Sequence, residues 1–209
     1  MNYYETRYTF DAGRTKVWRA ITEFLQKFIN EEATVLDLGS GYGDFINNIR
    51  AKKKIATDIN PEAKKYCSKG VIFIKALSTD LSSVDSKSVD TVFASNLFEH
   101  LDELQIQETI KEIKRILKKN GKLIVIQPNF RYAYKGYFDD FTHKSIFTHV
   151  SFCDLFVASG FKVDICMPKF LPLTLKSKLP KSYWLTKMYI NNPIKPLSGQ
   201  MLLIFSKER

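Results

Sequence analysis

Three closely spaced glycines follow a short apolar segment near the start of the chain, at positions 39, 41 and 43. Glycine permits sharp turns and lets the main chain lie against a ligand, so a turn of this composition is suited to hold a cofactor. The dinucleotide fingerprint requires the spacing G-x-G-x-x-G, but Asp44 stands where its third glycine is needed. An acidic side chain at the start of the next helix would oppose a pyrophosphate. The spacing therefore disfavours a dinucleotide.

A single carboxylate, that of Asp58, ends the second expected strand, nineteen residues after Gly39. A carboxylate in this position can accept hydrogen bonds from both hydroxyls of a ribose. The competing interpretation is a solvated aspartate in a loop. The occurrence of Asp58 together with the glycine turn favours ribose binding.

Histidine is the usual proton acceptor at neutral pH, and the chain has three histidines. His143 lies in the segment 127–147, which should begin at the carboxyl end of a strand, and is the better candidate for a catalytic base. The same segment offers groups that can stack on or hydrogen-bond to a ring or sugar: Tyr132, Tyr134, Tyr137, Asp139 and Asp140. His100 is the second catalytic candidate, and otherwise caps a helix or packs near the cofactor. The alternative is a surface loop in which Asp140 and His143 make local hydrogen bonds, and His149 is interpreted as structural.

The apolar periodicity predicts strands over residues 34–38, 54–59, 71–74, 89–94, 122–126, 161–166 and 201–205. It predicts helices over residues 15–29, 101–117 and 151–159, and two more after Gly43 and after Asn60-Pro61. Asn120-Gly121 is expected to end the long helix. Alternating strands and helices indicate an α/β fold: a Rossmann-like, seven-stranded, mostly parallel sheet with helices on both faces, in which ligands bind at the carboxyl ends of the strands.

Length and composition are those of a single globular domain covering residues 1–209. Residues 1–30 are expected to form an N-terminal helical cap. Residues 168–196, which are rich in Pro, Lys and aromatic residues, are expected to form a substrate-binding or surface-binding insertion. The chain is 44% hydrophobic with charges spread along it, which excludes disordered and fibrous classes. Its formal net charge of +10 would attract an anionic partner without identifying it.

Cysteine usage and hydropathy bear on compartment and metals. Cys67, Cys153 and Cys166 are odd in number and far apart, which favours reduced thiols and gives no paired spacing typical of zinc sites. We therefore expect no metal. The first nineteen residues lack the apolar core of a signal peptide, and no stretch of about 18 apolar residues occurs. A cytoplasmic location is expected, with peripheral contact at the inner membrane surface as an option.

The turn Asp37-Leu38-Gly39-Ser40-Gly41-Tyr42-Gly43 resembles motif I of the class I S-adenosylmethionine-dependent methyltransferases, whose cofactor has no phosphate to place. Residues 76–81 and 89–101 resemble later motifs of the same family, and the second is a close match. In the first, Leu77 replaces the acidic residue often found near the adenine amino group, so the backbone of Leu77 and Ser78, or Asp80, would serve there. The resemblance implies S-adenosylmethionine as cofactor, with contacts from Asp37, Gly39, Ser40, Gly41, Gly43, Asp58, Ile59, Leu77, Ser78, Ser95 and Asn96.

Short segments toward the C-terminus are similar to a subgroup of bacterial methyltransferases associated with cell-surface polysaccharide synthesis: 138–143, 160–161, 169–172, 176–180 and 199–201. This similarity implies a small-molecule or glycan acceptor, with a hydroxyl as the methylated group and His143 as the general base. An anionic acceptor would suit the net charge. The sequence leaves the oligomeric state open.

Two other functions fit parts of the sequence. Nucleic-acid methylation is suggested by the net charge and by lysines interleaved with aromatic residues in 168–196. Enzymes that methylate base amino groups carry an Asn/Asp-Pro-Pro-aromatic motif after strand four, whereas Ser95-Asn96-Leu97-Phe98 stands here, so nucleic acid is disfavoured. A catalytically idle fold whose segment 168–196 binds a membrane surface or protein partner is the third function considered.

Overall fold

The computed structural model describes residues 13–172 and 181–208, which form one domain around a seven-stranded sheet. The strands are β1 (Thr34–Leu38), β2 (Lys53–Asp58), β3 (Val71–Lys75), β4 (Val89–Ser95), β5 (Leu117–Pro128), β6 (Phe161–Pro172) and β7 (Ser198–Lys207). Their order is β3-β2-β1-β4-β5-β7-β6, with β7 antiparallel to both of its neighbours. The other paired strands are parallel, which confirms the predicted fold class.

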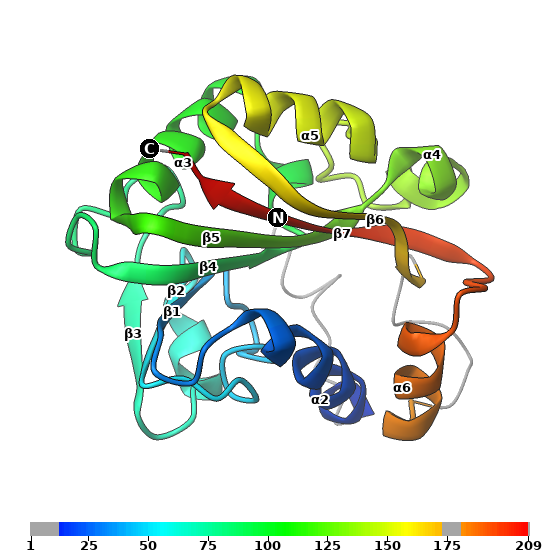
Figure 1. Cartoon of the computed structure of the whole chain (residues 1–209), viewed down its shortest axis with the longest axis horizontal. Coiled ribbons are helices and arrows are strands. Elements are labelled where there is room, and N and C mark those ends of the chain that lie inside the picture. The colour runs from blue at the N-terminus through cyan, green and yellow to red at the C-terminus, as the bar shows by residue number, and fades with distance from the viewer. Residues whose placement is uncertain (1–12, 173–180, 209) are drawn as a thin grey trace.

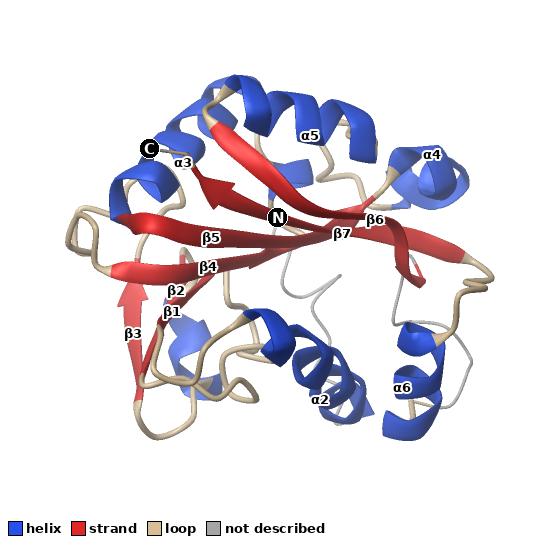
Figure 2. Cartoon of the chain, in the orientation of Figure 1, coloured by secondary structure: helices blue, strands red, loops and turns tan. Residues whose placement is uncertain are grey.

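Helices cover both faces of the sheet (Figures 1 and 2). On one face lie α3 (Glu103–Ile116), α4 (Phe130–Ala133) and α5 (His149–Ala158), and on the other lie α2 (Gly13–Leu25) and α6 (Tyr183–Asn191). Strand side chains alternate between two cores because successive residues of a strand point to opposite faces. In β5, Leu123 and Val125 join the α3–α5 core, whereas Ile124 and Ile126 join the α2 core.

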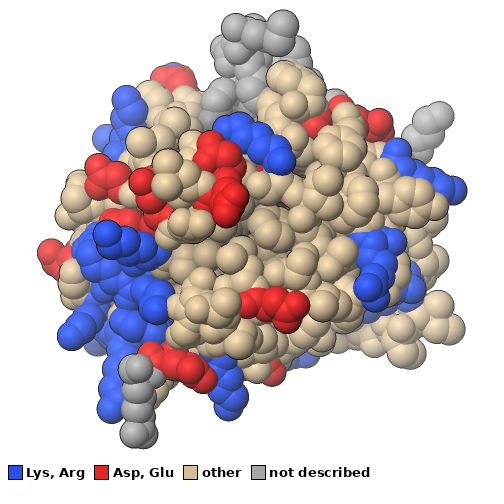
Figure 3. Space-filling view, turned by 90° about the horizontal axis from the view of Figure 1, so that it is seen from above, with Lys and Arg blue, Asp and Glu red and all other residues tan. Residues whose placement is uncertain are grey.

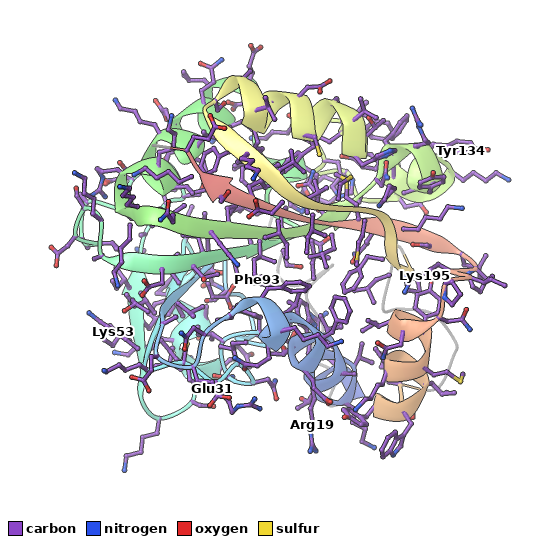
Figure 4. The ribbon with its side chains drawn as sticks, in the orientation of Figure 1. Arg19, Glu31, Lys53, Phe93, Tyr134 and Lys195 are labelled. Atoms are coloured by element: carbon purple, nitrogen blue, oxygen red, sulfur yellow. The ribbon has the colours of Figure 1, made fainter. Side chains whose placement is uncertain are left out.

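Aromatic packing fixes the position of α2 against the sheet. Phe93 points from β4 toward α2 (Figure 4), stacks on Phe45 with ring centroids 3.8 Å apart and meets the edge of Trp18 at 6.2 Å. All three side chains are buried. The predicted cap helix therefore exists as α2 followed by a 3-10 turn, Gln26–Phe28, and residues 1–12 of the cap lie outside the described residues.

The prediction of a helix after Gly43 was wrong, because residues 41–48 form successive turns. Two asparagine side chains bond to the backbone in this segment: Asn48 Nδ2 donates to the carbonyl of Asp44 and Asn47 Nδ2 to that of Tyr66, both over 2.8 Å. Asn48 Nδ2 occupies the Asp44 carbonyl to which Asn48 N–H would donate in an α-helix, and this N–H donates to Phe45 O instead over 3.0 Å. The helix expected after Asn60 is likewise a 3-10 helix, Pro61–Tyr66, capped by the Asn60 side chain.

The expected end of the long helix at Asn120-Gly121 was also wrong. Helix α3 begins after Asp102, whose side chain forms a capping box with Gln105, and ends at Ile116, where β5 begins at once. A carbonyl of the last helical turn finds its partner outside the helix, since Ser88 N–H donates to Ile116 O over 2.9 Å. Tertiary hydrogen bonds therefore end this helix, and no glycine cap is needed.

The segment 168–196 contributes both to the sheet and to a helix. Its first part, up to Pro172, continues β6, and α6 packs against α2 through an ion pair of Lys187 with Glu23 over 2.7 Å. The lysines at 176 and 178 lie outside the described residues. Among the described residues, no helix has both the length and the apolar character needed to cross a bilayer.

Candidate functional site

The glycine turn lies at the carboxyl end of β1, next to the point where strand order reverses between β1 and β4. Backbone N–H groups of Gly39 and Ser40 both donate to Thr57 O in β2 over 2.9 Å, and Gly43 N–H donates to Ser40 O over 2.8 Å. The three glycines have φ angles of +74°, +50° and +66°, a region that other residues rarely adopt. The sequence therefore needs glycine here to make this turn.

Asp58 holds the turn through its side chain. Its carboxylate accepts hydrogen bonds from Gly41 N–H at Oδ2 and from Asn60 N–H at Oδ1, both over 2.8 Å, and the residue is buried. A carboxylate offers about four lone-pair directions. Two acceptor positions thus remain for a ligand, and the exposed Ile59 beside it offers an apolar surface.

Asp37 and Ser40 complete the base of the turn. Burial raises the pKa of Asp37 to about 8, with further increases from the Asp44 and Asp58 carboxylates and an opposing hydrogen bond from the Ile46 backbone. The buried Ser40 hydroxyl has no hydrogen-bond partner among the described residues. A buried polar group without a partner is costly, so a ligand atom at this hydroxyl would be favourable.

The predicted contacts after β3 are partly engaged within the chain. The carbonyl of Leu77 accepts from Asp80 N–H over 3.1 Å, and Asp80 Oδ1 accepts from Ser82 N–H over 3.0 Å. The Ser78 hydroxyl accepts from Thr109 over 2.9 Å. The side chain of Leu77 is half exposed, which leaves an apolar surface close to the end of β2.

The segment after β4 connects the glycine turn to the histidines. Asn96 has a positive φ of 49° and receives a hydrogen bond from Gln200 at its Oδ1 over 3.2 Å, with Ser95 preceding it at the strand end. A methyl group added to Gly39 would lie 3.3 Å from Leu97 Cδ1. The 3-10 turn Phe98–His100 follows directly. The glycine turn, the strand end and His100 therefore belong to one contiguous region.

His100 and His143 lie together, with ring centroids 5.0 Å apart. The loop that carries His143 is held against the 3-10 turn, because the Glu99 carbonyl accepts from Lys144 N–H over 2.8 Å and from Ser145 N–H over 3.1 Å. Ligand atoms of Glu99, His100 and His143 all lie within 4.8 Å of one another. The two predicted catalytic residues thus share a site with a carboxylate.

The Glu99 side chain is the most buried member of this cluster, with 1% of the residue's surface exposed. Neither of its carboxylate oxygens has a hydrogen-bond partner among the described residues. Burial raises its pKa to about 8, opposed by the residue's own backbone N–H and assisted by the Asp140 carboxylate. Burial, followed by the neighbouring His143, lowers the pKa of His100.

The Thr142 hydroxyl defines the tautomer of His100. It donates its single proton to Asp140 Oδ1 over 2.6 Å, so it must accept the hydrogen bond that joins it to His100 Nδ1 over 2.9 Å. His100 therefore carries its proton on Nδ1, an assignment made from the hydrogen-bond network. The lone pair of the ring then lies on Nε2.

The segment 127–147 divides into a buried and an exposed part. Tyr137 is buried, donates to the Ser145 carbonyl and has its pKa raised by burial, so it stabilises the loop and is not a stacking surface. Tyr134 is exposed, whereas the Tyr132 ring contacts Lys169 Nζ, 4.6 Å from its centroid, and stacks with the His149 ring at 6.5 Å. His149 begins α5 and pairs through Nδ1 with Asn129 over 3.1 Å.

Sequence reasoning missed three polar residues of this region. Glu99 stands beside His100 in the sequence, and an acidic residue next to a histidine after a strand was a usable signal. The amide of Gln127, at the carboxyl end of β5, is fully buried without a partner among the described residues. Arg14 of α2 pairs with Asp44 over 2.7 Å and lies over the Tyr42 ring, a contact that no local pattern could reveal.

Charge is unevenly distributed on the face viewed from the side of α3 and α5 (Figure 3). Lys and Arg gather most densely at the left of this view, smaller groups lie at its right, and uncharged residues with some Asp and Glu lie between them. The net charge of +10 therefore does not form a continuous basic track across it.

Comparison with known proteins points consistently to one family. A family model for a methyltransferase domain matches residues 10–164. An uncharacterised methyltransferase-like protein of Schizosaccharomyces pombe is 32% identical over 121 residues, which cover 54% of this chain and 46% of that protein. The chain thus spans about half the length of this curated relative.

Solved structures share the fold over nearly the whole chain. A SAM-dependent methyltransferase from Archaeoglobus fulgidus superposes with a TM-score of 0.70 at 21% identity, covering 92% of this chain and 94% of that one. The methyltransferase partner in a complex with the Haloferax volcanii Trm112 methyltransferase activator gives 0.69 at 18% identity, covering 93% and 90%. At these identities the likeness concerns the fold.

Proposed function

Since the chain belongs to the methyltransferase domain family, we propose that it transfers a methyl group from S-adenosylmethionine to a hydroxyl of a small molecule or glycan. The hydrogen bond from Gly41 N–H to the Asp58 carboxylate carries the cofactor part of this proposal. It joins the turn after β1 to the carboxylate after β2, the two elements that an adenosyl ligand needs together.

The residues present fit this cofactor. Asp58 retains lone pairs for two ribose hydroxyls, and the Ser40 hydroxyl lacks a partner among the described residues. Exposed Ile59 and Leu77 provide apolar surfaces for a flat ring. Asp37, Gly39, Gly43, Ser78, Ser95 and Asn96 line the same strand ends as further contacts. When bound, S-adenosylmethionine supplies a methyl group on a positively charged sulfur.

The acceptor side is proposed at the cluster of Glu99, His100 and His143. Leu97 lies so near Gly39 that a methyl group added there would be 3.3 Å from Leu97 Cδ1, and the segment with Glu99 and His100 follows at once, so the two sites adjoin. His143, or His100 through Nε2, accepts the proton of the acceptor hydroxyl in protein that holds no cation. Tyr134 provides an exposed ring on which a sugar can stack.

Calorimetry with S-adenosylhomocysteine, followed by methyl transfer from labelled S-adenosylmethionine, tests this function. We expect saturable binding by the purified chain, and label incorporation into hydroxyl compounds such as glycosides rather than RNA or DNA. Absence of binding overturns the cofactor assignment. Transfer to nucleic acid with none to glycosides or small alcohols overturns the acceptor class.

Membrane contact is a second property that a specific observation favours. Trp184 and Met188 on α6 are 74% and 63% exposed, and Leu185 between them is also exposed. Aromatic and aliphatic side chains on a helix with nearby lysines suit an anionic lipid interface. Co-sedimentation with vesicles containing anionic lipid should decrease in a Trp184→Ser variant; equal sedimentation of both proteins would contradict peripheral binding through α6.

A further inference from the structure

We propose that Glu99, His100 and His143 form a binding site for one divalent transition-metal cation, with the oxygen of the acceptor as a further ligand. Cation binding needs only residues of this chain, whereas its use in catalysis rests on the proposed function. The proposed cation site departs from the expectation of no metal, which was based on the absence of paired cysteines.

Three ligand-bearing side chains converge in this cluster. One ligand atom from each of them lies within 4.8 Å of the others. In a tetrahedral site with bond lengths of about 2.0–2.2 Å, neighbouring ligand atoms are separated by roughly 3.3–3.6 Å. No pair of ligand atoms therefore needs to approach by more than about 1.5 Å, which side-chain rotation can supply.

Glu99 needs a partner that the described residues do not supply. Its carboxylate is buried, with 1% of the residue exposed, and its two oxygens have no hydrogen-bond partner among those residues. Removing such a group from water without a partner costs free energy. A cation in the cluster supplies the missing partner, so it accounts for a side chain that packing alone does not explain.

His100 is oriented by hydrogen bonds on the side of its ring that faces Thr142. Metal-binding histidines usually donate the other ring N–H to a carboxylate or another fixed acceptor, which sets the ring orientation. Here His100 Nδ1–H donates to Thr142 Oγ1, and Thr142 in turn donates to Asp140. These two hydrogen bonds leave Nε2 as the ligating atom. Thr142 and Asp140 are positioning residues for the site.

The ligand set selects the cation. Two imidazoles suit borderline ions such as Zn²⁺ or Fe²⁺, and the carboxylate also admits the harder Mn²⁺, while Mg²⁺ and Ca²⁺ prefer oxygen ligands throughout. Three protein ligands also leave a coordination position open, as in catalytic zinc sites. We infer that this position takes the acceptor hydroxyl.

In the loaded protein the histidine lone pairs bond to the cation and are not available as a base. Coordination acidifies the acceptor hydroxyl. Its O–H bond breaks with the proton passing to water, the electron pair stays on the oxygen, and that oxygen attacks the methyl carbon as the bond from carbon to sulfur breaks. The cation keeps its charge, and no oxidant or reductant is required.

The primary experiment is calorimetry of the purified, metal-stripped chain with Zn²⁺ alone, and in parallel with Mn²⁺ and Mg²⁺. We expect one Zn²⁺ or Mn²⁺ per chain and at least tenfold weaker binding of Mg²⁺. Glu99→Gln and His143→Asn should each weaken Zn²⁺ binding by about 100-fold or more, since each removes a ligand. His149→Asn is the matched control, because it removes a histidine outside the cluster, and should bind Zn²⁺ as the wild type does.

Thermal melting of each variant without metal identifies misfolded proteins. A Glu99→Asp variant, which keeps the carboxylate, provides a second comparison and should retain part of the Zn²⁺ affinity. Absence of Zn²⁺ and Mn²⁺ binding by the folded wild type overturns the site. Equal binding by wild type and a folded Glu99→Gln variant overturns it as well.

Failure of the cation site is distinguishable from failure of the proposed function. S-adenosylhomocysteine binding is measured in EDTA, where the cation plays no part. If S-adenosylhomocysteine binds and methyl transfer proceeds at full rate in EDTA, the catalytic use of the cation is disproved and the proposed function is retained. If Zn²⁺ binds and S-adenosylhomocysteine does not, the cofactor assignment is disproved and the metal site is retained.

Discussion

The backbone N–H of Gly41 lies 2.8 Å from Asp58 Oδ2, so the end of β2 fixes the turn that follows β1. The two residues are separated by sixteen positions along the chain, 42–57, and meet because β1 and β2 are parallel neighbours. One carboxylate thus both shapes the turn and faces the expected position of a ribose. Loss of the Asp58 side chain should therefore affect both the conformation of the turn and the binding of the ribose.

Replacing Asp58 should separate cofactor binding from turnover. Asp58→Ala removes charge-assisted hydrogen bonds of about 1.5–3 kcal/mol each, so S-adenosylhomocysteine should bind about 100-fold more weakly in calorimetry. Asp58→Asn, which keeps one acceptor oxygen, should fall between that variant and the wild type. His143→Ala is the control: it should bind the ligand normally and turn over slowly, and equal loss of binding in both alanine variants would contradict this division of roles.

Two glycine substitutions measure how tightly the first turn is packed. In Gly43→Ala, the added methyl would lie 2.9 Å from Asn47 Nδ2 and 3.3 Å from the Tyr66 carbonyl, whereas at Gly70 nothing lies within 4 Å. Both positions have positive φ and share the backbone cost of roughly 1–2 kcal/mol. Gly43→Ala should therefore lower the melting temperature more than Gly70→Ala, and equal decreases would show that Asn47 moves aside without cost.

Protonation of Asp37 should make stability depend on pH. The folded protein holds this proton up to about pH 8, while the unfolded chain loses it near 3.8, so the free energy of unfolding falls as pH rises between these values. Urea unfolding at about pH 5, 7 and 8.5 should show a decrease of a few kcal/mol in the wild type, since one proton contributes about 1.4 kcal/mol for each pH unit. Asp37→Asn should flatten this slope in part, because Glu99, whose pKa is also raised by burial, contributes in the same direction; an unchanged slope would exclude a neutral Asp37.

The positioning role of Thr142 is measurable with an isosteric change. Thr142→Val removes the acceptor for His100 Nδ1–H, so Zn²⁺ affinity should fall by about 10–100-fold, with slower turnover and unchanged affinity for S-adenosylhomocysteine. Thr186→Val is the matched control, because the Thr186 hydroxyl bonds within α6 to the Ser182 carbonyl, away from the cluster. Wild-type Zn²⁺ affinity in Thr142→Val would remove this hydroxyl from the site.

The parallel sheet and the glycine turn were predictable because their signals are local. Continuous apolar strands and glycines with a required backbone conformation mark them directly. The prediction of a helix after Gly43 failed because the Asn48 side chain bonds to the Asp44 carbonyl, and the predicted end of α3 failed because Ser88 N–H donates to the Ile116 carbonyl. These are competitions that periodicity does not register.

The histidine cluster was predictable only in part. His100 and His143 could each be singled out by residue type, but they are far apart in the sequence and are brought together by the bonds of Lys144 and Ser145 to the Glu99 carbonyl. The importance of Glu99 depends on complete burial, which follows from tertiary packing. A sequence pattern therefore identifies the candidates and does not reveal their arrangement.

The position of β7 between β5 and β6 has a consequence for synthesis on the ribosome. β6 joins the sheet through β7, so residues 161–172 cannot pair there until residues 198–207 have left the exit tunnel. Until then a nascent chain presents an open edge on β5 and an unpaired β6, both of which are templates for pairing with another chain. Stalled or truncated products should therefore depend on chaperones far more than the finished protein does.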